Sequence, residues 1–168
     1  MWLCHFYHIY IMKELLIKDV EIMHCWCDIS IQTTKYLLEH AHHDDTKKLF
    51  EYGLVSMQRW MWLFEELLAL WEWNIKCETS NALNALCLEA RNAADTIQDP
   101  THRDITMIYK YRNMCFYAQT GYEYYELLTD AVWMHELSQK FAQAMETIMA
   151  SHQYIRWTLK SLIEISKQ

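Results

Sequence analysis

The spacing of apolar residues over 46–77 is the strongest constraint in the sequence. Apolar side chains recur there at alternating steps of four and three, and polar side chains recur every seven residues on the far side. The apolar positions are Phe50, Leu54, Met57, Met61, Phe64, Leu68, Trp71 and Ile75, and the polar ones are Glu51, Gln58, Glu65 and Glu72. Such a heptad seam is typical of helical bundles and coiled coils. It predicts a helix over 46–77 that buries one side.

Glycine and proline are too scarce for a sheet protein of this size. The 168 residues contain two glycines and one proline, whereas a sheet needs many glycine- and proline-based turns. We therefore predict three more long helices, over 2–42, 80–119 and 122–166. Short links would make neighbouring helices antiparallel. The predicted fold is all-α, an up-down-up-down four-helix bundle forming one domain over 1–168.

One glycine and the single proline set two of the expected helix boundaries. Gly121 is predicted to end the third helix, because glycine is common just past a helix end. Pro100 either begins a new helix, with Asp99 as its cap, or kinks a continuous one. Continuity of the apolar register favours a third helix kinked near Pro100. The alternative fold is a stack of shorter helical hairpins, broken near residues 30, 100 and 151, so the continuity of 2–42 and 122–166 stays open.

The stretch "HAHHDDT" at 40–46 is predicted to be a tight turn between the first two helices. Asp44, Asp45 or Thr46 can cap the following helix through a side-chain oxygen. Histidines in a last helical turn also suit the negative end of the helix dipole. We therefore interpret this run as a turn and not as a metal cluster.

Charge and hydropathy exclude two classes of partner. The formal net charge is −7 and no basic stripe stands out, so a nucleic-acid partner is not expected. The apolar runs are too short for a bilayer or contain charged residues, so no membrane span is expected. No signal peptide is visible, which predicts a cytoplasmic protein with free thiols in a reducing compartment. The cysteines in question are Cys4, Cys25, Cys27, Cys77, Cys87 and Cys115.

The window 21–28, "EIMHCWCD", holds the clearest candidate for chemistry. On a helix, Glu21, His24, Cys25 and Asp28 fall within an arc of roughly 100°, while Cys27 points to the opposite, apolar side. Zinc accepts carboxylate, imidazole and thiolate ligands, so these four residues form the candidate zinc site. The favoured interpretation is that they are the solvent-exposed polar side of the helix, with no cofactor bound.

A di-iron centre is not favoured by the spacing of the Glu-x-x-His pairs. Such bundles use one pair from each of two helices. Here the pairs occur at 21/24 and 39/42, on one predicted helix and roughly 27 Å apart. The centre would require a break near residue 30. A haem site would need two facing core histidines, and nothing in the sequence pairs His24, His135 or His152.

Some apolar residues lie outside the predicted seams. Ile22, Ile29 and Tyr36 form a row spaced by seven, and Trp62 and Trp73 fall on the polar side of the 46–77 helix. Such residues are either buried broadly inside the bundle, which we favour, or form an exposed association surface. The second interpretation predicts a homo-oligomer or a helical protein partner.

No catalytic motif is visible, and two glycines cannot build a phosphate-binding loop. We therefore expect a non-enzymatic helical bundle that acts as a scaffold or as a helix-mediated association module. The many Trp, His, Met and Tyr residues and the scarcity of glycine favour a de novo designed origin. The alternative is a metal- or cofactor-binding four-helix bundle.

Overall fold

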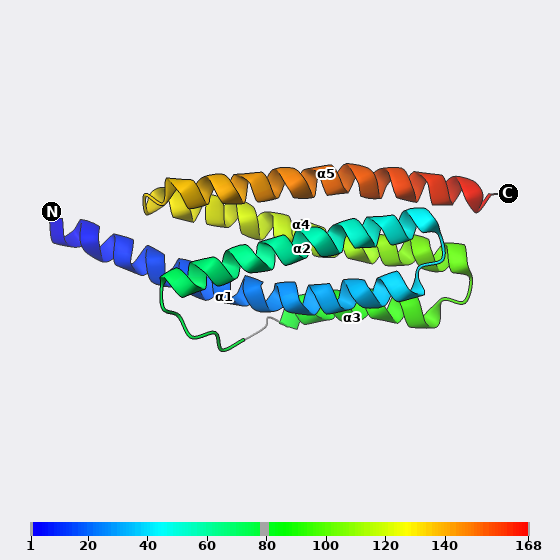
Figure 1. Ribbon diagram of the computed structural model, residues 1–168, viewed down its shortest axis with the longest axis horizontal. Coiled ribbons are helices and arrows are strands. Elements are labelled where there is room, and N and C mark those ends of the chain that lie inside the picture. The colour runs from blue at the N-terminus through cyan, green and yellow to red at the C-terminus, as the bar shows by residue number, and fades with distance from the viewer. Residues whose placement is uncertain (1, 78–80, 168) are drawn as a thin grey trace.

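The computed structural model describes residues 2–77 and 81–167, with side chains from residue 11 onward. Within these ranges the chain forms five helices and no strand, so the predicted all-α class is confirmed. The helices are α1 (Trp2–His40), α2 (Asp44–Leu70), α3 (Asn81–Thr96), α4 (Pro100–Ala131) and α5 (His135–Ile165). All five lie along one long axis (Figure 1).

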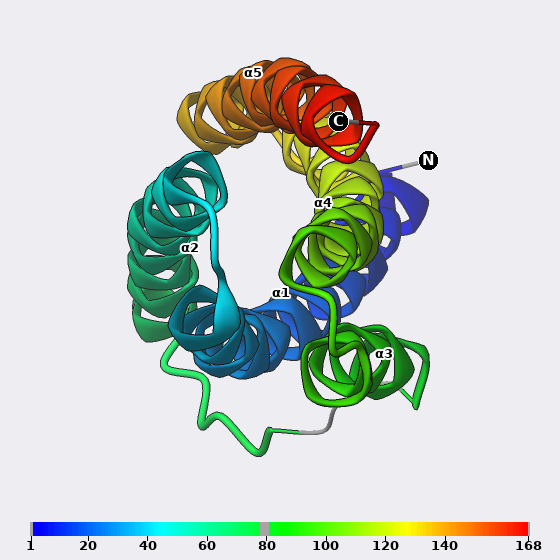
Figure 2. The ribbon, with the colours of Figure 1, turned by 90° about the vertical axis from the view of Figure 1, so that its right-hand side faces the viewer.

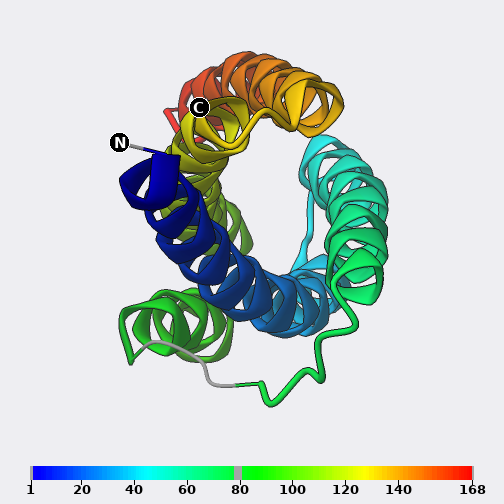
Figure 3. The same cartoon turned by 90° about the vertical axis from the view of Figure 1, so that its left-hand side faces the viewer.

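Four long helices form the bundle, and α3 lies outside it. Seen end-on, α1, α2, α5 and α4 make a ring, and α3 lies against the outer side of α1 and α4 (Figures 2 and 3). Helices α2 and α4 run in the same direction (Figure 1), so the chain must return to the far end of the bundle between them. Residues 71–99, including α3, make this return. The bundle therefore has one long crossover connection and not short links throughout.

The region predicted as one kinked helix, 80–119, is instead the whole of α3 and part of α4. These two helices run in opposite directions (Figure 1). Asp99 Oδ1 accepts a hydrogen bond from the backbone N–H of His102 at 2.7 Å, and Pro100 occupies the first turn. An aspartate cap followed by proline begins a helix. The kinked interpretation is wrong, and the alternative of a new helix at Pro100 is correct.

The predicted helix end at Gly121 is also wrong, because Gly121 lies inside α4. The actual turn is at 132–134, where Trp133 has a left-handed φ of 60°. Gly121 faces α1: a Cβ there would lie 3.4 Å from the Cε and Sδ atoms of Met23, which is an ordinary van der Waals contact.

Helices α1 and α5 are continuous through residues 30 and 151, so the stack of shorter hairpins is wrong at both points. Hydroxyl side chains do not break them, because they bond to carbonyls one turn earlier. Thr34 Oγ1 donates to Ser30 O at 2.8 Å, and Ser151 Oγ donates to Thr147 O at 3.0 Å. This is the usual way a helix accommodates serine and threonine. The two Glu-x-x-His pairs are therefore not brought together by a break at residue 30.

Helix α2 ends seven residues before the predicted end at 77. Glu72 and Cys77 have left-handed φ angles of 52° and 51°, and Ile75 is 37% exposed. Within the helix, the polar stripe Glu51, Gln58 and Glu65 is exposed as predicted. The buried side is shifted slightly from the predicted seam and comprises Thr46, Leu49, Phe50, Gly53, Trp60, Leu63, Phe64, Leu67 and Leu68.

The turn between α1 and α2 is held by a buried aspartate from α4. Asp104 is fully buried, and its carboxylate accepts hydrogen bonds from the backbone N–H groups of His42 (3.0 Å) and His43 (2.8 Å). His43 Nε2 also lies 3.0 Å from Thr101 Oγ1. The helix is capped at His43 without a side-chain hydrogen bond. The tight turn is confirmed, but the predicted side-chain caps at Asp44, Asp45 or Thr46 are wrong.

Among the described helices, none has both the length and the apolar character needed to cross a membrane.

Candidate functional site

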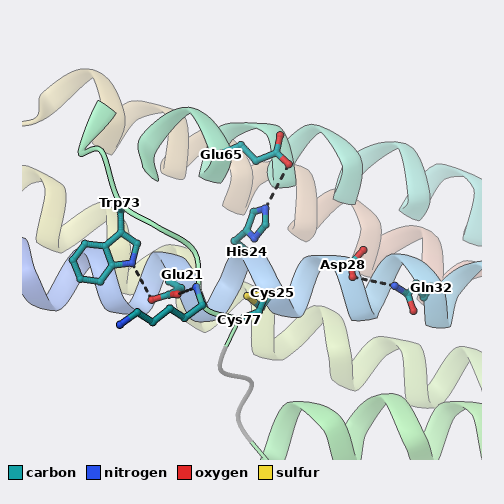
Figure 4. The surroundings of a disulfide bond; sticks show 9 residues. Glu21, His24, Cys25, Asp28, Gln32, Glu65, Trp73 and Cys77 are labelled. Carbon is teal, nitrogen blue, oxygen red and sulfur yellow. Dashed lines mark hydrogen bonds and ion pairs between the residues drawn. A yellow bond between two sulfur atoms is a disulfide. The ribbon is translucent and has the colours of Figure 1, made fainter. Parts of the chain in front are cut away.

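Residues 71–77, which we call the strap, fold back over the side of α1 that carries Glu21, His24 and Cys25 (Figure 4). Cys77 is joined to Cys25 by a disulfide bond. The Glu21 carboxylate accepts hydrogen bonds from Trp73 Nε1 at 3.0 Å and from the backbone N–H of Lys76. One covalent bond and one carboxylate therefore attach the strap to α1.

The environment of Glu21 keeps its side chain ionised. Glu21 is only 9% exposed, and this burial raises the pKa of its carboxyl. Hydrogen bonds from the backbone of Lys76 and Cys77 and from the Trp73 side chain act the other way, and the net pKa is lowered. Hydrogen bonds to a carboxylate stabilise its charged form. At neutral pH, Glu21 is therefore a charged acceptor for the strap.

His24 lies between the disulfide and α2. Its Nε2 atom is 3.5 Å from Glu65 Oε1, whereas its Nδ1 atom is buried and has no hydrogen-bond partner. Ligand atoms of His24, Cys25 and Cys77 all lie within 4.8 Å of one another. Within the described part of the chain, these three residues form the group whose positions could hold a metal ion.

The predicted quartet does not converge. Asp28 is exposed and its Oδ2 accepts from Gln32 Nε2 at 3.0 Å, and Figure 4 shows it apart from the disulfide. Glu21 is occupied by the strap. Cys25 is 1% exposed and Glu21 is also buried, so the expectation that all four lie on a solvent-exposed side is wrong for these two.

Cys77 is the member of this cluster that sequence reasoning missed. It lay at the end of a predicted helix, and the pairing of cysteines cannot be deduced from sequence alone. The strap had to leave the helix before Cys77 could reach Cys25. The signal available in the sequence was only the polar run that follows Trp73.

The prediction of free thiols is wrong for Cys25 and Cys77 and holds for Cys27, Cys87 and Cys115, which are free and buried. The Cys4 side chain lies outside the described residues. Burial raises the pKa of Cys27 and of Cys115 to about 12. These two side chains are therefore neutral thiols at physiological pH and poor nucleophiles.

The predicted association residues do not form one surface. Ile22, Ile29 and Tyr36 are half-buried and pack against the core. Tyr36 also meets α3, because its hydroxyl donates to Asp95 and the Arg91 guanidinium lies 5.7 Å from its ring centroid. Trp73 is half-buried in the strap. Trp62, at 63% exposed, is the member that remains on the surface.

Trp62 lines a groove between α2 and α5. The groove has a volume of about 610 Å³, and a neighbouring hollow of about 400 Å³ shares two of its lining residues. We call the two together the α2–α5 groove. Its lining residues are Lys48, Tyr52, Arg59, Trp60, Trp62 and Leu63 from α2 and Lys140, Gln143, Glu146, Thr147, Ala150 and Tyr154 from α5.

The groove is basic although the chain is acidic. Lys48, Arg59 and Lys140 line it together with one acidic residue, Glu146, whereas the whole chain carries a net charge of −7. Lys140 Nζ also lies 3.6 Å from Glu66 Oε2, an ion pair that links α5 to α2. The groove therefore combines exposed aromatic surface with positive charge.

These features define a class: an all-α four-helix bundle with a short fifth helix in its crossover connection. The sequence matches no protein-family model and none of the curated proteins. Among solved structures, the fold is similar to the E. coli stress protein YciF, with a TM-score of 0.84 and 12% identity over 91% of this chain and 97% of that one. It is also similar to YcfI of Rhodopseudomonas palustris, proposed to be a structural protein, with a TM-score of 0.79 and 14% identity over 86% and 92% of the two chains.

At these identities the similarity establishes the fold. A non-enzymatic helical protein is compatible with both neighbours. Because both are bacterial proteins, the comparisons do not support the interpretation of a de novo designed sequence.

Proposed function

We propose that this protein is a non-enzymatic association module that binds an amphipathic helix of a partner protein in the α2–α5 groove. The observation that carries the proposal is the exposed Trp62 beside a basic groove that runs between two antiparallel helices. Tryptophan is enriched among the residues that dominate binding energy at interfaces. An amphipathic helix laid into a groove is a common mode of peptide recognition.

The charges of the groove select the chemistry of the partner. Lys48, Arg59 and Lys140 favour a helix whose apolar side is flanked by aspartate or glutamate. Complementary charge raises the association rate and disfavours partners of the wrong sign. Because these groups are near the surface, added salt should weaken binding.

The proposal that the protein is not an enzyme rests on the protonation state of two buried cysteines. Cys27 and Cys115 are buried thiols with pKa values of about 12, so they are not poised for nucleophilic attack. We also propose a cytoplasmic location, supported by three buried free thiols in the described core. The disulfide weighs against that location, and thiol alkylation in rapidly quenched cells would decide it.

Two synthetic peptides test the proposed binding: an amphipathic helix with leucines on one side and glutamates on the other, and its counterpart with lysines. We expect the glutamate peptide to bind the 168-residue chain at least tenfold more tightly than the lysine peptide does in fluorescence anisotropy. Trp62→Ala should weaken its binding about tenfold or more. Tyr109→Ala is the control, because Tyr109 is an aromatic residue on α4 that is 51% exposed but does not line the groove.

The result that would overturn the proposal is equal binding of both peptides, or an equal loss in the Trp62 and Tyr109 variants. Light scattering adds a third outcome. If the protein forms a dimer that Trp62→Ala dissociates, the occupant of the groove is a second copy of this chain and not a helical partner.

A further inference from the structure

The cluster at the strap contains two cysteines and a histidine. The two cysteine sulfur atoms can either bond to each other or bind a metal ion, but not both. Cys25 and Cys77 are bonded to each other, and a ring nitrogen of His24 lies within 4.8 Å of both sulfur atoms. Zinc binds cysteine only as thiolate. The same two sulfur atoms therefore cannot form the disulfide and bind zinc at once.

We propose that Cys25, Cys77 and His24 form a redox-gated zinc site. In the oxidised protein the two sulfur atoms form the disulfide. After reduction they bind Zn²⁺ together with His24 Nδ1, and a water completes the four-coordinate shell. Three protein ligands with one open position is an established zinc arrangement.

The surroundings of His24 prepare it to act as a ligand. Nδ1 is buried and has no hydrogen-bond partner, while Nε2 lies 3.5 Å from the Glu65 carboxylate. If the proton sits on Nε2 and is donated to Glu65, the lone pair of Nδ1 is free to bind a metal. Histidine ligands of metals typically donate their other ring N–H to such a carboxylate, which fixes the tautomer and strengthens the ligand.

Entry into the zinc state requires a reductant, which we take to be a dithiol. The dithiol is oxidised to its own disulfide and loses two hydrogens, and the Cys25–Cys77 disulfide gains them as two thiols. Zinc binding then displaces one proton from each thiol. Cys77 is exposed, so the strap side of the bond is open to the reductant.

The zinc state would keep the strap in place when the covalent bond is lost. The disulfide joins residues separated by 52 positions. Without it, and without metal, the strap keeps its hydrogen bonds to Glu21 but loses its attachment through the Cys77 side chain. A zinc ion shared by α1 and the strap restores that attachment under reducing conditions.

Cobalt(II) is the probe for the site, because its thiolate complexes have a charge-transfer absorption band that zinc lacks. The 168-residue chain carries Cys4→Ser, so that the Cys4 thiol cannot act as a ligand. A phosphine reductant replaces the dithiol to avoid competing ligands. We expect one equivalent of cobalt to bind the reduced protein with a thiolate band, which one equivalent of zinc removes. The oxidised protein should show no band.

Variants assign the ligands. Cys77→Ser should abolish the band. Glu65→Gln should weaken binding about 10- to 100-fold, as is typical when the partner of a metal-bound histidine is removed, and His24→Gln should weaken it more. Cys87→Ser is the control, since Cys87 is a free buried thiol that takes no part in the cluster. Circular dichroism confirms that each variant is folded.

The proposal is overturned if the reduced protein binds no cobalt, if the oxidised protein binds it equally, or if His24→Gln binds as tightly as its parent. None of these results bears on peptide binding in the α2–α5 groove, because the two proposals use different residues.

Discussion

Helix α2 is preceded and followed by connections that are held in the same way but differ in length. The turn at 41–43 is bound by the Asp104 carboxylate of α4, and the strap at 71–77 is bound by the Glu21 carboxylate of α1. Both carboxylates are buried and both accept backbone N–H groups of the connection. In each case an acid on a neighbouring helix supplies the acceptor that the connecting backbone lacks.

The difference is that the strap also has a covalent bond. A three-residue turn has few conformations to lose, so one carboxylate suffices. The return from α2 to α4 is far longer, and a longer closed segment costs more conformational entropy. The Cys25–Cys77 bond offsets part of that cost. The comparison predicts that the long connection depends chiefly on its disulfide and the short one on its carboxylate.

The largest expected effect is the loss of the disulfide. Cys77→Ser opens a loop between residues separated by 52 positions. The free energy of unfolding should fall by about 4 kcal/mol relative to the oxidised parent, as the chain-entropy model gives for a loop of this size. Urea denaturation with a metal chelator present measures it. The reduced parent should match the variant, and a variant as stable as the oxidised parent would show that the strap does not depend on its covalent bond.

The next effect is expected from Asp104→Asn. The side chain keeps its shape, but its charge is lost while two backbone N–H groups still point at it. Hydrogen bonds to a charged group contribute about 1.5–3 kcal/mol, so we expect a loss of about 2–3 kcal/mol in urea denaturation. Asp28→Asn is the control, because Asp28 is exposed and should change stability by less than about 0.5 kcal/mol. Equal effects of the two changes would contradict the role given to Asp104.

Glu21→Gln should cost less than Asp104→Asn, about 1–2 kcal/mol at neutral pH, because the disulfide still holds the strap. The pKa of Glu21 is lowered in the folded protein, so its contribution is fully present above the ordinary glutamate pKa, near 4.5. It is lost as the pH falls through the folded-state pKa. The difference in melting temperature between parent and variant should thus be constant above about pH 5 and shrink in more acidic solution. A difference that persists at the acid end would rule out the Glu21 carboxylate as the titrating anchor.

The same two connections mark the limit of what the sequence predicts. Periodicity identifies the apolar side of a helix, and it correctly predicted the all-α class and the burial of Cys27. It does not report where the chain leaves the helix. The heptad continues to Ile75, yet α2 ends at Leu70 and the following residues bond to Glu21.

Gly121 and the turn between α4 and α5 show the same limit of prediction from sequence. Gly121 was predicted to end a helix, but it lies inside α4 beside Met23, whereas Trp133 makes the turn with a left-handed φ. A glycine inside a helix and a glycine at its end look identical in a sequence. Likewise, Glu21 and Asp104 are anchors only because segments more than 50 residues away fold onto them. Such contacts depend on tertiary structure, which local patterns do not contain.

The smallest effect, and the most specific to the strap, is expected from Trp73→Phe. The change keeps an aromatic ring and removes the Nε1–H donor, which lies 3.0 Å from Glu21 Oε2. The remaining donors to the carboxylate are the backbones of Lys76 and Cys77, so the strap should open more often without a large loss of global stability. We expect the free energy of local opening to fall by about 1 kcal/mol, which makes hydrogen exchange of the Lys76 amide roughly fivefold faster.

Trp71→Phe is the matched control, since Trp71 is also half-buried but is not among the donors to Glu21. Faster exchange in both variants would mean that ring packing, and not the hydrogen bond, holds the strap closed, and the parallel with the Asp104 turn would then fail at this end of α2.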